Sequence, residues 1–95
     1  MANTAKMQQQ PTRTIRELES LINETASAMA RENQAFIEAT GKAQNHEYGV
    51  SAGNKVEAQA FATWSRKAAQ HETKKKELQG QLDELQTELK HARAA

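Results

Sequence analysis

The sequence predicts an all-α fold in which two long helices form an antiparallel helical hairpin with coiled-coil character. Residues 14–43 contain no proline and a single glycine, Gly41, close to their end. Residues 54–95 contain no proline and only Gly80. Residues 44–53 between them hold the other two glycines. Because glycine and proline are the strongest breaks in helical patterns, we expect two helices that fold back on each other.

The expected organisation has four parts. A flexible polar tail at residues 1–13 precedes a helix at 14–43, a loop at 44–53 and a second helix at 54–93. The tail is rich in glutamine and holds Pro11, and tails of this kind rarely become ordered unless they dock.

The composition fits a narrow seam between helices. The chain has 95 residues, of which 37% are hydrophobic and 4% aromatic, and this length corresponds to one small domain. Much of the apolar content is alanine, so the large apolar side chains are too sparse for a thick core. Small chains bury a low fraction of their surface and often need association to be stable. We therefore expect a homodimer.

The first helix has a clear start. Thr14-Ile-Arg-Glu17 fits a capping box, in which the Thr14 hydroxyl accepts the Glu17 backbone N–H and the Glu17 side chain reaches back; Thr12 is a competing cap. Asn33 falls within the apolar stripe that follows. It is either a polar group at the helix edge, which we favour, or a buried Asn that fixes the register. The stripe has steps of three and four, which place it on one helical face: Ile15, Leu18, Ile22, Ala26, Met29, Phe36, Ile37 and Thr40.

A heptad pattern runs along the second helix. Its C-terminal leucines have spacings of four, three and four, which are typical of a coiled-coil seam. His71 and Lys75 occupy seam positions in the middle, where large apolar residues are missing, and Gly80 falls opposite the seam. The complete pattern is Phe61, Trp64, Ala68, His71, Lys75, Leu78, Leu82, Leu85, Leu89 and Ala92.

The lengths of the two helices lead to a prediction about assembly. A first helix of about 30 residues, folded back antiparallel, covers the second only to about residue 84. Leu85 and Leu89 then extend past it and need another partner, for which we favour a second copy. The oligomerisation residues predicted on this basis are Leu78, Leu82, Leu85 and Leu89.

Tyr48 and Val50 are apolar residues in an otherwise polar loop. We favour the interpretation that they fold back over the end of the hairpin as a plug. The alternative is that they form an exposed contact for a partner.

The segment FATWSRK around Trp64 is the strongest candidate for a binding hot spot, because Trp and Arg dominate interface energetics. The alternative is that Phe61 and Trp64 pack against Phe36 or Ile37 in the hairpin core. The residues predicted to bind a partner are Phe61, Trp64, Arg66, Lys67 and Tyr48.

A basic segment follows this aromatic pair. Five basic residues within positions 66–76 oppose one acidic residue, Glu72, and such a run is either a phosphate-contacting stripe or, as we favour, a solvated helix face. The possible phosphate contacts are Lys67, Lys74 and Lys75.

Catalytic and metal-binding patterns are missing from the sequence. The chain has no cysteine and no glycine-rich phosphate loop. His46, His71 and His91 are far apart, His46-Glu47 is a weak metal motif, and Asp83 is the only aspartate. We expect no enzyme activity, no cofactor and no metal. The sequence also has no signal peptide and no apolar stretch that could span a membrane, so we expect a cytoplasmic protein, with leaderless export left open.

These features favour a non-enzymatic helical interaction protein that binds and masks, inhibits or adapts a larger protein, as a chaperone, an adaptor or a phage-type inhibitor does. The alternatives are a nucleic-acid-binding accessory factor that uses residues 66–76 and a structural subunit of a helical assembly. No family motif is present. The size and the expected hairpin are similar to those of the small WXG100-type secreted proteins, but the turn reads Tyr48-Gly49-Val50 in place of W-x-G, and no residue role is carried over.

Overall fold

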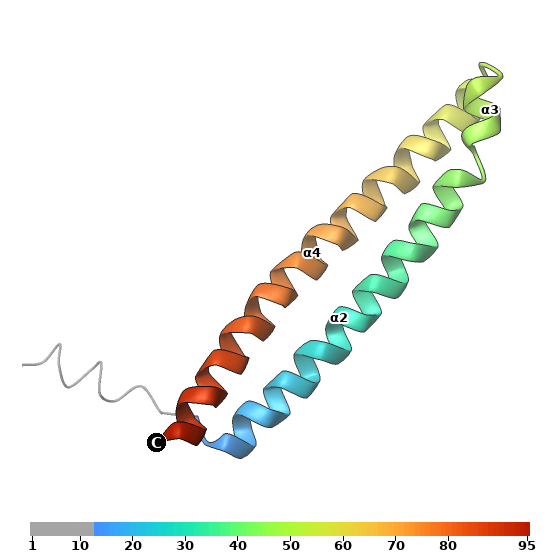
Figure 1. Ribbon diagram of the computed structural model, residues 1–95. Coiled ribbons are helices and arrows are strands. Elements are labelled where there is room, and N and C mark those ends of the chain that lie inside the picture. Colours follow the sequence, from blue (N-terminus) through green and yellow to red (C-terminus); the bar gives the residue numbers. More distant parts are fainter. Residues whose placement is uncertain (1–12) are drawn as a thin grey trace, which may run out of the picture.

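The computed structural model describes residues 13–95, which form a helical hairpin. Helix α2 (Ile15–Gln44) and helix α4 (Lys55–Ala94) run antiparallel along their length, and the one-turn helix α3 (Glu47–Ser51) lies at the tip (Figure 1). The molecule is long and thin, with extents of 67 × 27 × 14 Å. Residues 13–95 contain no strand, so the all-α hairpin prediction is confirmed. The predicted tail at 1–13 and the competing cap Thr12 lie, except for Arg13, outside the described residues.

Helix α2 begins with the capping box that the sequence predicts. The Glu17 N–H donates to the Thr14 hydroxyl at 3.1 Å, and the Thr14 N–H donates to the Glu17 carboxylate at 3.1 Å. The hydrogen bond from the Thr14 backbone N–H and, after it, the Thr14 side chain lower the pKa of the Glu17 carboxyl. At its other end α2 continues past Gly41 to Gln44. The apolar stripe continues there too, because Ala43 is buried against α4.

The connection at residues 44–53 contains a helical turn where we expected only a loop. The Val50 N–H donates to the His46 carbonyl at 3.1 Å, which closes the turn of α3. The chain then reverses at Gly53, whose φ of +80° lies in the left-handed region that favours glycine. Asn54 caps α4, since its side-chain oxygen accepts the N–H groups of Val56 and Glu57 at 3.0 and 3.1 Å.

The register of the hairpin corrects the prediction about the C-terminal leucines. Leu85 and Leu89 do not extend past the first helix; they pack on Leu18 in its first turn, with Leu21, Ile22 and Ala92 around them. The expectation was wrong because it assumed that the end of α2 packs against the first residues of α4. In the structure α3 lies beside that first turn, so α2 pairs with a part of α4 nearer the C-terminus. Leu18 is completely buried as a result.

The seam changes character along its length. Leucines fill it near the chain termini, and three alanines, Ala39, Ala43 and Ala68, are buried nearer the tip. His71 and Lys75 lie between these two zones, half-buried, with polar partners on α2. The predicted heptad positions of α4 are all buried or half-buried, whereas Gly80 is exposed on the opposite face.

Candidate functional site

The hairpin tip exposes apolar side chains. Tyr48 is 86% exposed, Val56 73% and Val50 38%. The prediction that Tyr48 and Val50 form a plug is therefore wrong, most clearly for Tyr48. The reason is the unexpected turn of α3, in which His46 and Gly49 face α4 and the neighbouring position 48 is rotated toward solvent.

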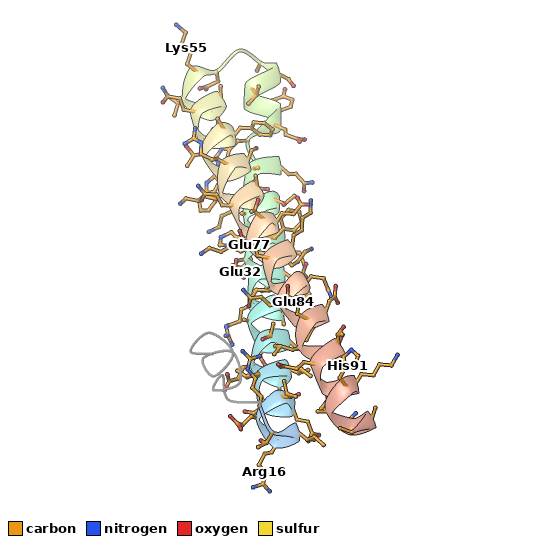
Figure 2. The ribbon with its side chains drawn as sticks, turned by 90° about the vertical axis from the view of Figure 1, so that its left-hand side faces the viewer. Arg16, Glu32, Lys55, Glu77, Glu84 and His91 are labelled. Carbon is orange, nitrogen blue, oxygen red and sulfur yellow. The ribbon has the colours of Figure 1, made fainter. Side chains whose placement is uncertain are left out.

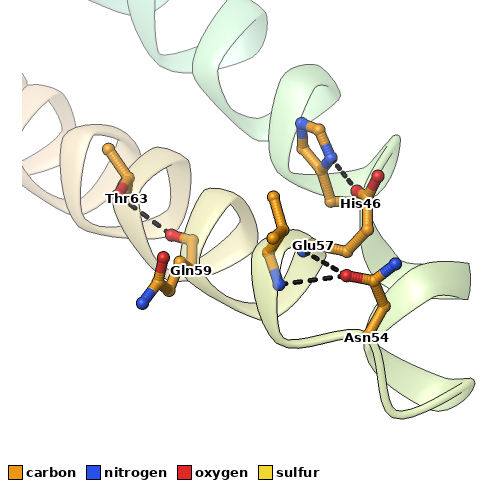
Figure 3. A network of polar contacts seen from close by, with 6 residues as sticks. His46, Asn54, Glu57, Gln59 and Thr63 are labelled. Atoms are coloured by element: carbon orange, nitrogen blue, oxygen red, sulfur yellow. Dashed lines mark hydrogen bonds and ion pairs between the residues drawn. The ribbon is translucent and has the colours of Figure 1, made fainter.

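Three contacts brace this exposed tip. The Nδ1 atom of His46 bonds to the carboxylate of Glu57 and joins the start of α3 to the first turn of α4. Asn54 caps the same turn (Figure 3). Gly49 lies so close to α4 that a Cβ atom built there would overlap the side chain of Glu57. The tip is thus a closely packed unit in which Glu57 contacts both His46 and Gly49.

Trp64 lies at the edge of the seam. Its indole is half-buried, with the ammonium of Lys42 from α2 4.4 Å from the ring centroid and that of Lys67 4.5 Å away. Both distances are in the range of cation–π attraction. Trp64 therefore has a structural contact with α2 and a solvent-accessible edge, which combines the core and the surface interpretations.

Phe61 lies in a different groove from the lysine-flanked indole. It lines a shallow depression of about 280 Å³ together with Phe36 and Thr40 of α2 and Ser65 and Ala69 of α4. Phe36 also has the ammonium of Lys75 5.2 Å from its ring centroid. The aromatic pair that the sequence places together is thus divided between the two edges of the seam.

The basic segment is partly occupied by contacts within the hairpin. His71 Nδ1 lies 2.6 Å from the carboxylate of Glu32, and the Lys75 ammonium donates to the Asn33 side chain at 3.2 Å. Lys76 pairs with Glu72 at 3.7 Å. Lys75 is directed toward α2, which weakens its assignment as a phosphate contact.

Asn33 is exposed while it accepts this hydrogen bond. It is therefore a polar group at the helix edge, as we favoured, and the buried, register-fixing alternative is wrong.

A second groove lies near the chain termini. It has a volume of about 370 Å³, and Leu21 and Leu85 contribute its apolar side chains. Glu84 and Glu88 line it from α4. Arg13 pairs with Glu88 at 3.1 Å on the same rim.

The structure does not gather the predicted partner-binding residues into one surface. Tyr48 belongs to the tip, whereas Phe61, Trp64, Arg66 and Lys67 follow along α4. Sequence reasoning missed Val56, which is exposed at the tip, and Ile37, which is 53% exposed on α2. Val56 follows the Asn54 cap by two residues and so belongs to the first turn of α4, but its exposure depends on how α3 packs on that turn, which the sequence does not predict.

Within residues 13–95, no three His, Cys, Asp or Glu side chains lie close enough to hold a metal ion. His46 contacts Glu57 and not the neighbouring Glu47 that the sequence motif suggested. In the same part of the chain, no helix has the length and apolarity needed to cross a membrane.

The sequence matches no protein-family model, and comparisons with curated proteins and with solved structures found no similar protein. The class of protein is therefore defined by the fold alone: a small all-α helical hairpin.

Proposed function

We propose that this protein is a non-enzymatic, dimeric interaction protein of the cytoplasm that binds a larger protein through the tip of its hairpin and masks, inhibits or adapts it. The observation that carries the proposal is the exposure of Tyr48, 86%, on a helical turn that is fixed to α4. Tyr is enriched at binding hot spots because it buries a large area at a low cost in conformational entropy.

The bracing of the tip supports the same proposal. A side chain presented by an ordered element loses less entropy on binding than one on a mobile loop. The contacts of Glu57 with His46 and Gly49, together with the Asn54 cap, keep Tyr48 and Val56 in one arrangement. The chemistry of this surface, one aromatic and two valine side chains, fits a shallow apolar pocket on the partner.

The other residues predicted to bind a partner lie farther along α4. Phe61, Trp64, Arg66 and Lys67 follow the start of the helix at Lys55 by about 9–18 Å. A partner that contacts Tyr48 would reach them only by lying along the hairpin.

Affinity capture from the native host tests the proposal. The bait pair is the wild type and the double variant Tyr48→Ser/Val56→Ser, and Ile37→Ser is the matched control because Ile37 is an exposed apolar residue away from the tip. We expect mass spectrometry to identify a protein that the wild type and the control retain and the double variant loses. Equal recovery with all three baits would contradict the proposal.

Nucleic-acid binding through residues 66–76 is supported less well. Lys75, Lys76 and His71 have polar partners within the hairpin, and Lys67 lies over the ring of Trp64, which leaves Arg66 and Lys74 for phosphate. Binding to phosphate weakens steeply with salt, whereas apolar docking of the tip does not, so a salt titration of the captured complex separates the two functions.

A further inference from the structure

One face of α4 carries its charges in two separate bands. Lys67 and Lys74 lie toward the tip, and Glu77 and Glu84 lie toward the chain termini. Their spacings of seven, three and seven keep the four residues on one side of the helix. Glu88 extends the acidic band by one further turn.

Helix α2 repeats this arrangement along the same face. Trp64 and Lys42 are in contact across the two helices near the tip, and Leu21 and Glu84 line one groove near the termini. Between these points, a stripe of α2 at steps of three and four runs through Glu24, Arg31 and Lys42. Glu24 is level with the acidic band of α4, and Arg31 and Lys42 are level with its basic band. Glu38 departs from this pattern, because it is acidic and lies beside the basic band. We call this combined surface the banded face.

The basic and acidic bands of α4 lie at equal distances on either side of one point of the helix. Lys74 and Glu77 are equally distant from a point between Lys75 and Lys76, and so are Lys67 and Glu84. Figure 2 shows Glu77 and Glu84 along the middle of the hairpin, with Lys55 at one end and His91 at the other. A two-fold axis that lies in the plane of contact, level with that point and perpendicular to the helix, brings each basic band opposite the acidic band of a second copy.

The same operation matches the apolar features of the banded face. It brings Trp64 of one copy level with the groove of the other copy that contains Leu21 and Leu85. This groove has Glu84, Glu88 and Arg13 on its rim, where Arg13 pairs with Glu88. The indole has the ammonium groups of Lys42 and Lys67 within 4.5 Å of its centroid. An aromatic side chain flanked by two cations thus meets an apolar groove whose rim carries two carboxylates and one guanidinium.

We propose that a second copy of this chain docks antiparallel on the banded face, with Trp64 entering the Leu21–Leu85 groove. The proposal gives a geometry to the dimer of the proposed function, and it uses a surface separate from the tip. Self-association through one patch requires a self-complementary surface, and the banded face is self-complementary. A nucleic acid would gain from the basic band alone and would be repelled by the acidic band.

The absence of cysteine from the sequence permits a clean cross-linking test. Gln70 and Gln81 are uncharged and lie symmetrically about the proposed axis. In the antiparallel dimer Gln70→Cys of one copy lies level with Gln81→Cys of the other, whereas identical residues are about 16 Å apart along the helix. We expect a mixture of the two single variants to form a mixed disulfide rapidly, while each variant alone forms at least tenfold less disulfide-linked dimer.

Disulfides in each variant alone, with none specific to the mixture, would indicate a parallel dimer and overturn the proposal. No disulfide under any condition would place the second copy on another face and would also overturn it.

Charge exchange gives an independent readout in solution. Lys67→Glu/Lys74→Glu and Glu77→Lys/Glu84→Lys should each raise the dimer dissociation constant at least tenfold in sedimentation experiments, with their circular dichroism spectra retained. An equimolar mixture should restore a heterodimer. A mixture that remains monomeric, or wild-type protein that remains monomeric, would contradict the proposal. Tyr48→Ser/Val56→Ser leaves the banded face intact, so its dimerisation should be unchanged even where partner binding is lost.

Discussion

His71 of α4 meets Glu32 of α2 in the middle of the hairpin seam, with His71 Nδ1 2.6 Å from a carboxylate oxygen of Glu32. The contact lies between the leucine zone and the alanine zone of the seam. It fixes one imidazole of α4 on one carboxylate of α2, and so it contributes to the register of the two helices.

A double-mutant cycle measures the contribution of this pair to stability. Chemical denaturation of Glu32→Ala, His71→Ala and the double variant at pH 6 should give a coupling energy of about 1 kcal/mol. A buried hydrogen bond to a charged group contributes somewhat more than this. The smaller value is expected here because both side chains are half-buried. Additive effects of the two substitutions would show that the contact does not stabilise the hairpin.

Leu18 is the most deeply buried large side chain of the described residues, and its truncation should destabilise the protein strongly. Leu18→Ala should lower the free energy of unfolding by about 3 kcal/mol, because it leaves a cavity against Leu85 and Leu89. Ile15→Ala is the matched control in the same turn, and since Ile15 is 40% exposed its cost should be about 1 kcal/mol or less. Equal, small effects of the two substitutions would contradict the register described above.

Two glycines should respond to alanine in opposite directions. Gly80 is helical, and a Cβ atom added there meets nothing within 4 Å, so Gly80→Ala should stabilise the protein by up to about 1 kcal/mol. Gly49→Ala should destabilise it, because the new Cβ atom overlaps Glu57. Thermal melts of the two variants beside the wild type provide the measurement. A stabilising Gly49→Ala would show that α3 does not pack on α4 at this distance.

The capping box predicts that part of the free energy of unfolding is lost at low pH. The pKa of Glu17 is lowered in the folded protein by its hydrogen bonds with Thr14. A lowered folded-state pKa means that the contribution to stability is present above the unfolded-state pKa of glutamate and is lost as pH falls through the lower, folded-state value. In an NMR titration the pKa of Glu17 should lie below the ordinary value of glutamate, and Thr14→Ala should raise it only part of the way, because the backbone N–H of residue 14 still donates to the carboxylate. A Glu17 pKa at the ordinary value of glutamate in the wild type would contradict the capping box.

The sequence predicts the two long helices well because their signals are local. The Thr14–Glu17 capping box and the glycines at 49 and 53 define where the helical stretches begin and end, and both helices lie within one residue of the ranges expected for them. The seam positions of α4 follow from a spacing of three and four residues, which is also a local property.

The register and the tip could not be predicted in the same way. The turn of α3 depends on a tertiary contact, the packing of Gly49 and His46 on Glu57, and nothing in the segment EYGVS predicts it locally. Because that turn shifts α2 along α4 and rotates Tyr48 toward solvent, two errors have one cause: the expected projection of Leu85 and the expected plug.

The most direct test of the account is the affinity of the purified partner for variants of the tip. Isothermal titration calorimetry with the partner identified by capture should show at least a tenfold weaker affinity for Tyr48→Ser/Val56→Ser than for the wild type, with Ile37→Ser unchanged and all three proteins equally helical. An affinity for the double variant equal to that of the wild type would contradict the central claim that this hairpin binds its partner through the tip.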